Sequence, residues 1–175
     1  MVFYELLEKR QSIRSFKKDS IPPEIIQRIF KAIQSAPSAG NRQAYKIVQV
    51  FDPTIKTALA RAAWNQNFIA AAPFVLVFFA DVPESSGRYG DRGNFYALQD
   101  ATIACAYAQL AITAEGLGSV WIGAFNDNQV HNILHAPSGL KPVAILPIGY
   151  PAEKPRRTPR KVLSQVLVNE SFSEK

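Results

Sequence analysis

The sequence predicts a single α+β domain in which helices flank a largely antiparallel sheet. The chain has 175 residues, 47% of them hydrophobic and 19% charged, which is the size and composition of one globular domain. Segments of helical and strand character are mixed without the strict strand–helix–strand repeat of a parallel sheet. No internal repeat or linker divides the chain, so we expect one domain over residues 1–175.

The first half of the chain contains clear signals for the starts and ends of elements. The Pro-Pro-Glu sequence at 22–24 favours a helix start, and Pro37 favours its end. Asp52 followed by Pro53 predicts a second start of this kind. The apolar run at 74–80 is short enough to be a strand buried on both faces. The expected elements are helices at 3–10, 22–36 and 53–63, and strands at 45–51 and 74–80.

In the second half, a polar, glycine-bearing excursion at 81–94 precedes a long helix from Phe95 to about Glu115. This helix is apolar almost all round, so it is expected to be buried on several sides, in part by a second subunit. Asp100 and Gln109 interrupt it, which argues against a membrane span. A core segment at 120–125, a helix at 127–135 and a strand at 143–148 follow. The apolar tail at 162–168, part of a C-terminal extension at 162–175, is expected to pair as a strand with a sheet edge of the partner subunit.

The composition excludes several classes of site. One cysteine and two histidines cannot form a disulfide framework or a Cys/His zinc site, and they favour a reducing, cytoplasmic setting. Cys105 is expected to be a buried, inert thiol, and His131 and His135 a surface pair. No signal peptide is recognisable, and no phosphate-binding glycine loop or nucleophile elbow is present. An organic cofactor that carries the reaction is therefore favoured.

A cluster of polar groups near the N-terminus is the best candidate for binding an anion. Arg10, Ser12 and Arg14 alternate, so an extended backbone would direct all three toward one ligand. Guanidinium groups suit phosphate oxygens, and the net charge of +6 also favours an anionic ligand or partner. The alternative is a solvated basic turn at the end of a helix.

Three further polar clusters, at 37–43, 118–125 and 156–161, are spaced like contacts to one extended ligand. Arginines from both ends of the chain could meet at a phosphate. Small residues at 118, 123 and 124 would let the backbone approach a flat ring.

Six motifs in this order resemble the FMN-dependent nitroreductase family. They are R-x-S-x-R-x-F at 10–16, A-P-S-A-x-N-x-Q at 36–43, A-P-F at 72–74, G-L-G-x-x-W-I-G-A-F at 116–125, P-x-G-Y-P at 147–151 and P-R-K at 159–161. The resemblance implies an intertwined α+β homodimer with non-covalent FMN at the subunit interface. It also implies that NADH or NADPH reduces nitroaromatics, quinones or similar acceptors in a ping-pong cycle through flavin N5.

The resemblance further assigns roles to individual residues. Arg10, Gln11 and Ser12, with Arg160 and Lys161, would bind the phosphate and ribityl end of FMN, and Arg14 the pyrimidine edge. The partner subunit would cover the ring with Pro37, Ser38 and Ala39, and Asn41 belongs to the same cofactor-binding motif. Asn65 would contact the ring edge, and the backbone of Gly123 and Ala124 would face flavin N5. The residues suggested for the substrate pocket are Arg88, Tyr89, Arg92, Phe95 and Tyr96.

Other functions stay open from the sequence. The arginine clusters are also compatible with a basic module that binds nucleic acid or another polyanion. A flavin-binding protein could instead carry out dehalogenation, enone reduction or flavin fragmentation. The favoured hypothesis is the oxidoreductase, with a small-molecule acceptor and without nucleic acid, membrane or metal as a partner.

Overall fold

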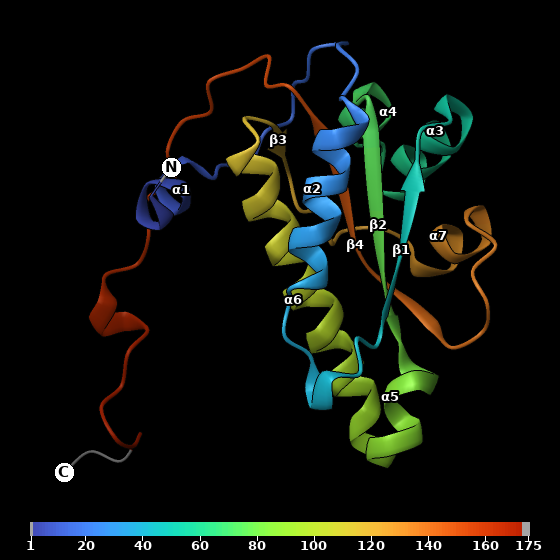
Figure 1. Ribbon diagram of the computed structural model, residues 1–175, viewed down its shortest axis with the longest axis vertical. Helices are drawn as coiled ribbons and strands as arrows, with labels where there is room; N and C mark the ends of the chain where they lie inside the picture. The colour runs from blue at the N-terminus through green and yellow to red at the C-terminus, as the bar shows by residue number, and fades with distance from the viewer. Residues whose placement is uncertain (1, 173–175) are drawn as a thin grey trace.

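The chain forms a four-stranded antiparallel sheet with helices on both faces, as a computed structural model that describes residues 2–172 shows (Figure 1). The strand order is β1-β2-β4-β3. The strands are β1 (Tyr45–Val50), β2 (Phe74–Asp81), β3 (Gly118–Ser119) and β4 (Leu140–Gly149). The α+β prediction is confirmed.

The two central strands are buried on both faces, which explains the continuous apolar run of β2. Phe74, Leu76 and Phe78 pack with α2 (Pro23–Gln34) and α6 (Gly93–Ala114). Val75, Val77 and Phe79 point to the opposite face. There they meet residues of α3 (Pro53–Ala62), α4 (Phe68–Ala71) and α7 (Asp127–Ile133). The result is a helix–sheet–helix sandwich.

Local capping chemistry fixes the start of α3. The Asp52 side chain accepts hydrogen bonds from the backbone N–H groups of Thr54 at 2.8 Å and Ile55 at 2.9 Å. Pro53 then occupies a position in the first turn, where its missing N–H is not needed. The start predicted from Asp52 and Pro53 is therefore confirmed.

The excursion at 81–94 is helical rather than irregular. It forms α5 (Val82–Tyr89) and the 3₁₀ turn η2 (Gly90–Arg92), and α6 begins at Gly93 instead of Phe95. The Asp81 side chain caps α5 by accepting from the backbone N–H of Glu84 at 3.2 Å. An aspartate followed by proline and glutamate is a helix-start signal, but three nearby glycines and the polar composition concealed it.

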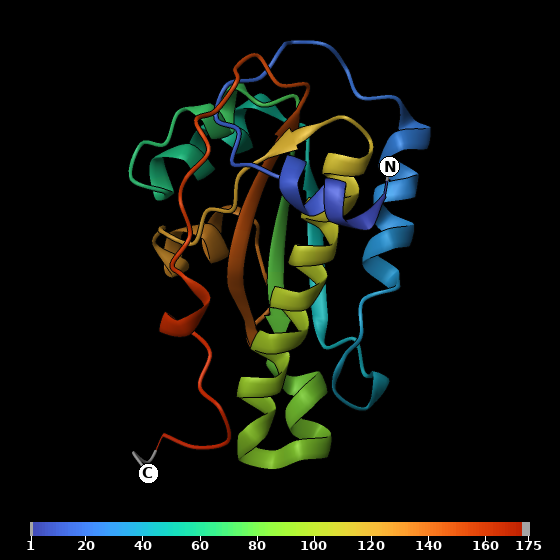
Figure 2. The same cartoon turned by 90° about the vertical axis from the view of Figure 1, so that its left-hand side faces the viewer.

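The two ends of the chain lie outside the sandwich. Helix α1 (Phe3–Lys9) has no buried residue and crosses one end of α6, and the face of α6 beside it is open (Figure 2). Residues 162–168 form no strand; their only regular structure is the 3₁₀ turn η3 (Leu163–Gln165). The segment lies away from both edges of the protomer's own sheet, so the expected packing on a partner subunit of the extension at 162–175, whose last three residues lie outside the described chain, stays a prediction. Within residues 2–172, no helix is long and apolar enough to cross a bilayer.

Candidate functional site

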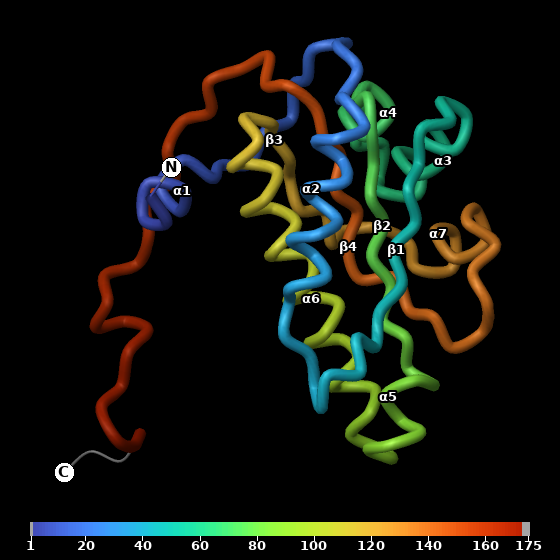
Figure 3. Tube along the Cα trace, in the orientation of Figure 1, coloured from blue at the N-terminus to red at the C-terminus, as the bar shows by residue number. Residues whose placement is uncertain are grey.

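The main candidate site is a cavity of about 590 Å³ between the two ends of the chain. One wall comes from residues between 7 and 14, and the other from residues between 153 and 160. Figure 3 shows how the trace arches away from the sheet after β4 and comes down toward α1. Its volume lies within the range of about 300–1,000 Å³ that is usual for small-molecule sites. We refer to it as the arginine cavity.

Backbone contacts hold the first wall against the sheet. Helix α1 ends at Lys9, and the next residue, Arg10, has an extended backbone with φ −62° and ψ 112°. Ser12 then forms a parallel bridge with Ser119, and the Ile13 N–H donates to the Ser119 carbonyl at 3.0 Å. A Cβ atom at Gly118 would lie 2.6 Å from the Ile13 side chain, so only glycine allows this approach. The extended segment places Arg10, Ser12 and Arg14 on the cavity.

Glu153 joins the two walls. Its Oε1 atom accepts hydrogen bonds from the backbone N–H groups of Arg14 and Ser15, the latter at 2.9 Å. The Ala152 N–H also donates to the Ser15 carbonyl at 2.9 Å. These contacts leave the Arg14 side chain free to line the cavity, because only its main chain is used.

The cavity is strongly cationic. Its lining contains two carboxylates, Glu8 and Glu153, and the five guanidinium groups of Arg10, Arg14, Arg156, Arg157 and Arg160. Over residues 2–172, no arginine of this cavity takes part in an ion pair. Such an excess of fork-like donors suits a phosphate group.

The Gln11 Oε1 atom adds an acceptor to this set of donors. Gln11 lines the cavity, and its Oε1 is buried without a hydrogen-bond partner among the described residues. Buried polar atoms are normally satisfied, so a ligand with a hydroxyl or N–H donor would complete the site. Together with the arginines, this acceptor fits a ligand such as FMN, which carries a phosphate and several hydroxyl groups.

The remaining residues assigned to the cofactor lie elsewhere in the protomer. Lys161 follows Arg160 but does not line the cavity. Pro37, Ser38, Ala39 and Asn41 belong to residues 37–44, which surround η1 (Ala39–Asn41) beside the other end of α6 and which we call the η1 loop (Figure 1).

Asn65 and the segment of Gly123 and Ala124 form a third group. Trp64 and Asn65 have positive φ angles of 57° and 60° in the turn after α3. The Gln66 side chain donates to the carbonyls of Ala63 at 3.0 Å and Ala124 at 3.3 Å, so it connects this turn to the 123–124 segment.

The residues suggested for the substrate pocket form one cluster at the junction of α5 and α6. The Arg92 guanidinium lies 5.1 Å from the ring centre of Tyr96 and 5.5 Å from that of Phe95. Tyr89 packs edge-on against Tyr96 at 5.0 Å, and Arg88 lies over Tyr89. The cluster lies next to η1: the Tyr89 hydroxyl is so near Gly40 that a Cβ atom there would collide with it.

Several residues of the cavity were given no individual role from the sequence. Arg156 and Arg157 belong to the predicted basic cluster, but their place in a proline-rich stretch does not distinguish them from solvated residues. Glu153 gives no sequence signal, because its role depends on contacts with residues 138 and 139 positions earlier.

Other reactive side chains do not form a second centre in the described chain. Cys105 is fully buried in α6, and burial raises the pKa of its thiol, as expected for an inert residue. The His131 ring lies 3.2 Å from the Pro137 carbonyl oxygen. No group of three or more His, Cys, Asp or Glu residues between 2 and 172 is arranged to hold a metal ion.

Comparison with known proteins agrees with the motif pattern. The family model described as "Nitroreductase family" matches residues 7–69 and 50–150. A protein of Thermus thermophilus named "NADH dehydrogenase" is 35% identical, over 91% of this chain and 92% of its own. An "Iodotyrosine deiodinase" of Haliscomenobacter hydrossis is 27% identical, over 86% and 80%.

A solved structure supports the same relationship. The NADPH:FMN oxidoreductase of Vibrio harveyi, complexed with NAD+, superimposes with a TM-score of 0.90 and 27% identity, over 98% of this chain and 78% of its own. The fold, the family model and the sequence relatives agree, and the chain belongs to the nitroreductase family.

Proposed function

We propose that the protein is an FMN-dependent oxidoreductase that uses NADH or NADPH to reduce small organic acceptors, such as nitroaromatics or quinones. The observation that carries the proposal is the arginine cavity, where guanidinium groups from both ends of the chain converge. Family membership supports the enzyme class and its cofactors, since related proteins are named as NADH dehydrogenase and NADPH:FMN oxidoreductase.

In this proposal, the residues of the protein bind and orient the cofactor and exclude water. Arg10 and Arg160, with Ser12, would bind the phosphate, and the excess of positive charge would hold it without a covalent bond. FMN, when bound, supplies the hydride-transfer chemistry. This division of labour is consistent with a cavity lining that contains neither cysteine nor histidine among the described residues.

A homodimer is part of the proposal. The residues assigned to the cofactor lie in separate places on one protomer, because the η1 loop and the arginine cavity are at opposite ends of α6. A second copy related by a two-fold axis could bring its η1 loop to the ring of the bound flavin. The exposed apolar side chains of α6, which include Phe95, Leu98 and Tyr107, favour the same contact.

The test of the proposed function uses the protein as purified. It should be yellow, and NADH or NADPH should bleach it in the absence of air. Nitroaromatics and quinones should then restore the colour. Protein that is purified without colour, and that retains no FMN once unbound cofactor has been removed, would reject the proposal.

Reductive dehalogenation is a second candidate, favoured by the similarity to iodotyrosine deiodinase. Release of iodide from an iodinated phenol, with bleached protein as the only reductant, would identify it. Binding of a polyanion is less favoured, because the arginines line a cavity instead of a convex face. A cytoplasmic location remains a prediction from the cysteine content.

A further inference from the structure

The η1 loop has an unusual backbone. Gly40, Asn41 and Gln43 have positive φ angles of 53°, 57° and 46°. Residues other than glycine adopt this backbone region at a cost in conformational free energy, so the surrounding contacts must impose it. Within the loop, the Gln43 N–H donates to the Ser38 hydroxyl at 2.9 Å, and the Gln43 side chain donates to Asn41.

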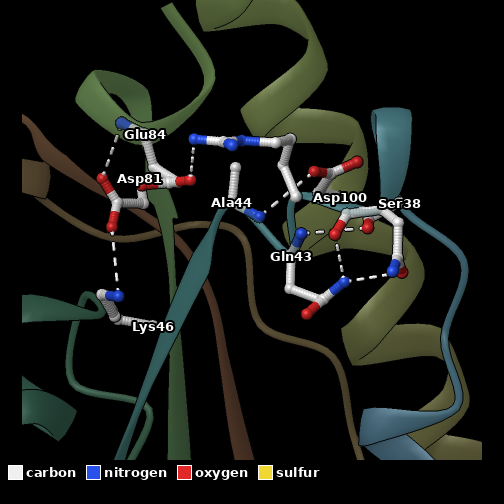
Figure 4. Close-up of polar contacts among 9 residues, drawn as sticks. Ser38, Gln43, Ala44, Lys46, Asp81, Glu84 and Asp100 are labelled. Carbon is white, nitrogen blue, oxygen red and sulfur yellow. Dashed lines mark hydrogen bonds and ion pairs between the residues drawn. The ribbon is translucent and has the colours of Figure 1, made fainter. Parts of the chain in front are cut away.

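Asp100, on α6, joins the two ends of this loop, and Figure 4 shows its contact with the Ala44 end. Its Oδ1 accepts from the Ala39 N–H at 2.8 Å, and its Oδ2 accepts from the Ala44 N–H at 3.2 Å. Asp100 is 2% exposed, and within residues 2–172 its carboxylate forms no ion pair. A buried carboxylate without a cationic partner is costly, so these two backbone donors are its main stabilising contacts.

Two ion pairs lie on the other side of the loop, one from the loop itself and one from the start of β1. Arg42 contacts Glu84 of α5 at 2.5 Å, and Lys46 contacts Asp81 at 3.3 Å. Both pairs are partly exposed, so salt screens them and their contribution is small. Asp100 is different because it is buried and binds main-chain groups, whose positions define the loop itself.

We propose that Asp100 is a positioning residue of the flavin site. It holds the η1 loop in the conformation in which Ser38 and Ala39 cover the flavin of the partner subunit. Asp100 does not touch the cofactor; it acts through the N–H groups of Ala39 and Ala44. This inference rests on the proposed function for the cofactor and the dimer, but the attachment of the loop by Asp100 does not.

The test compares Asp100→Asn with Ile112→Val in the purified holoprotein. Asparagine keeps the size of the side chain but offers one acceptor, and its NH₂ group faces a backbone donor. Ile112 is fully buried in the same helix, near its C-terminal end, so Ile112→Val controls for general destabilisation. The loop is probed by trypsin cleavage after Arg42, and flavin release by the FMN fluorescence that appears on dilution.

For Asp100→Asn we expect trypsin cleavage after Arg42 and the dissociation constant of FMN each to rise by about tenfold, the effect of losing a hydrogen bond to a charged group. The visible circular dichroism of the remaining bound flavin should also change. Ile112→Val should leave all three close to the wild type. If Asp100→Asn does not fold, Asp100→Glu keeps the charge and shifts the carboxylate by one methylene, and the same changes are expected at smaller size.

Two outcomes would overturn the inference in different ways. Unchanged cleavage after Arg42 would show that Asp100 does not hold the loop. Faster cleavage with unchanged flavin affinity and circular dichroism would show that the loop is held but does not serve the flavin. Wild-type protein that binds no FMN would reject the proposed function, while the cleavage result would still report on the loop.

Discussion

Arg10 and Arg14 flank the bridge that Ser12 forms with Ser119, on the segment that leaves helix α1. Their alternate spacing predicted a shared ligand, and both line the arginine cavity. Gln11, between them, also lines it, although strict alternation would direct it to the other side. The alternate spacing predicts which side chains of an extended segment share a side. Between α1 and the bridge at Ser12 the backbone is irregular, so the side chain of Gln11 also turns toward the cavity.

Removal of the Arg10 guanidinium should weaken FMN binding. In Arg10→Ala we expect the dissociation constant to rise roughly tenfold to a hundredfold, since a hydrogen bond to a charged group contributes about 1.5–3 kcal/mol. Fluorescence titration of FMN measures it. The control is Arg61→Ala, which removes the same charge from α3, away from the cavity. Equal affinities of Arg10→Ala and wild type would reject the phosphate assignment.

Arg14 should affect the potential of the flavin more than its affinity. A cation near the pyrimidine edge stabilises the negative charge that the ring gains on reduction. Arg14→Ala should lower the midpoint potential by about 20 mV or more, where 30 mV corresponds to about 1.4 kcal/mol for a two-electron couple. Redox titration against a reference dye measures it, and an unchanged midpoint potential would contradict this role.

At the scale of elements, the predictions succeeded where the signal is local. Helix α3 follows from the two residues at its start, and β2 from the length of its apolar run. Helix α5 was missed, although Asp81 caps it, because glycine-rich composition outweighed the cap signal. The tail at 162–168 has the composition of a strand but forms none within the protomer, because a strand also needs a free edge, which depends on tertiary structure; its pairing with the partner subunit stays a prediction.

The cap of α3 can be measured. Asp52→Ala leaves two backbone donors of the first turn without the carboxylate, and should lower the free energy of unfolding by about 1 kcal/mol. Urea unfolding followed by circular dichroism provides the measurement. Asp91→Ala, at an exposed aspartate of η2, should have little effect.

The packing of α2 on α6 contains a contact that depends on pH. Arg28 donates two hydrogen bonds to Glu115, at 2.8 and 2.7 Å, and these lower the pKa of Glu115 from its ordinary value of 4.5. Because the folded pKa is depressed, this contribution to stability is present above about pH 4.5 and is lost as the pH falls through the lowered value.

Glu115→Gln should therefore be less stable than wild type near neutral pH and should approach it in acid. Thermal unfolding at a series of pH values between neutrality and acid would measure the difference. Glu5→Gln, which changes an exposed residue of α1, is the matched control and should show no such trend. A constant gap at all pH values would contradict the role of the pair.

For the whole molecule, the apolar character of the segment that forms α6 is the sequence feature that predicted a second subunit. An almost wholly apolar helix in a small domain is difficult to cover with its own chain, and α6 indeed exposes Phe95, Leu98 and Tyr107. The sequence could not show how the residues assigned to the cofactor are distributed over the protomer. That division depends on which end of α6 each segment reaches, a tertiary property.

The proposed dimer predicts that a charge on the open face of α6 separates the subunits. Leu98→Glu should shift the protein toward the monomer in analytical ultracentrifugation, because an unpaired carboxylate would be buried in the contact. The same variant should lose FMN. Gln129→Glu adds an equal charge on α7, on the other side of the sheet, and should remain dimeric. A Leu98→Glu dimer that retains FMN would refute this arrangement.

The contact between Glu153 and Arg14 spans 139 positions of the chain. The arginine cavity therefore forms only after the strands between Arg14 and Glu153 have assembled, and a partly folded intermediate would lack the cavity. Occupancy by a ligand must accordingly favour the native state as a whole and raise its melting temperature in proportion to the logarithm of ligand concentration above saturation. Cellular supply of the cofactor would in this way regulate how long the polypeptide survives proteolysis.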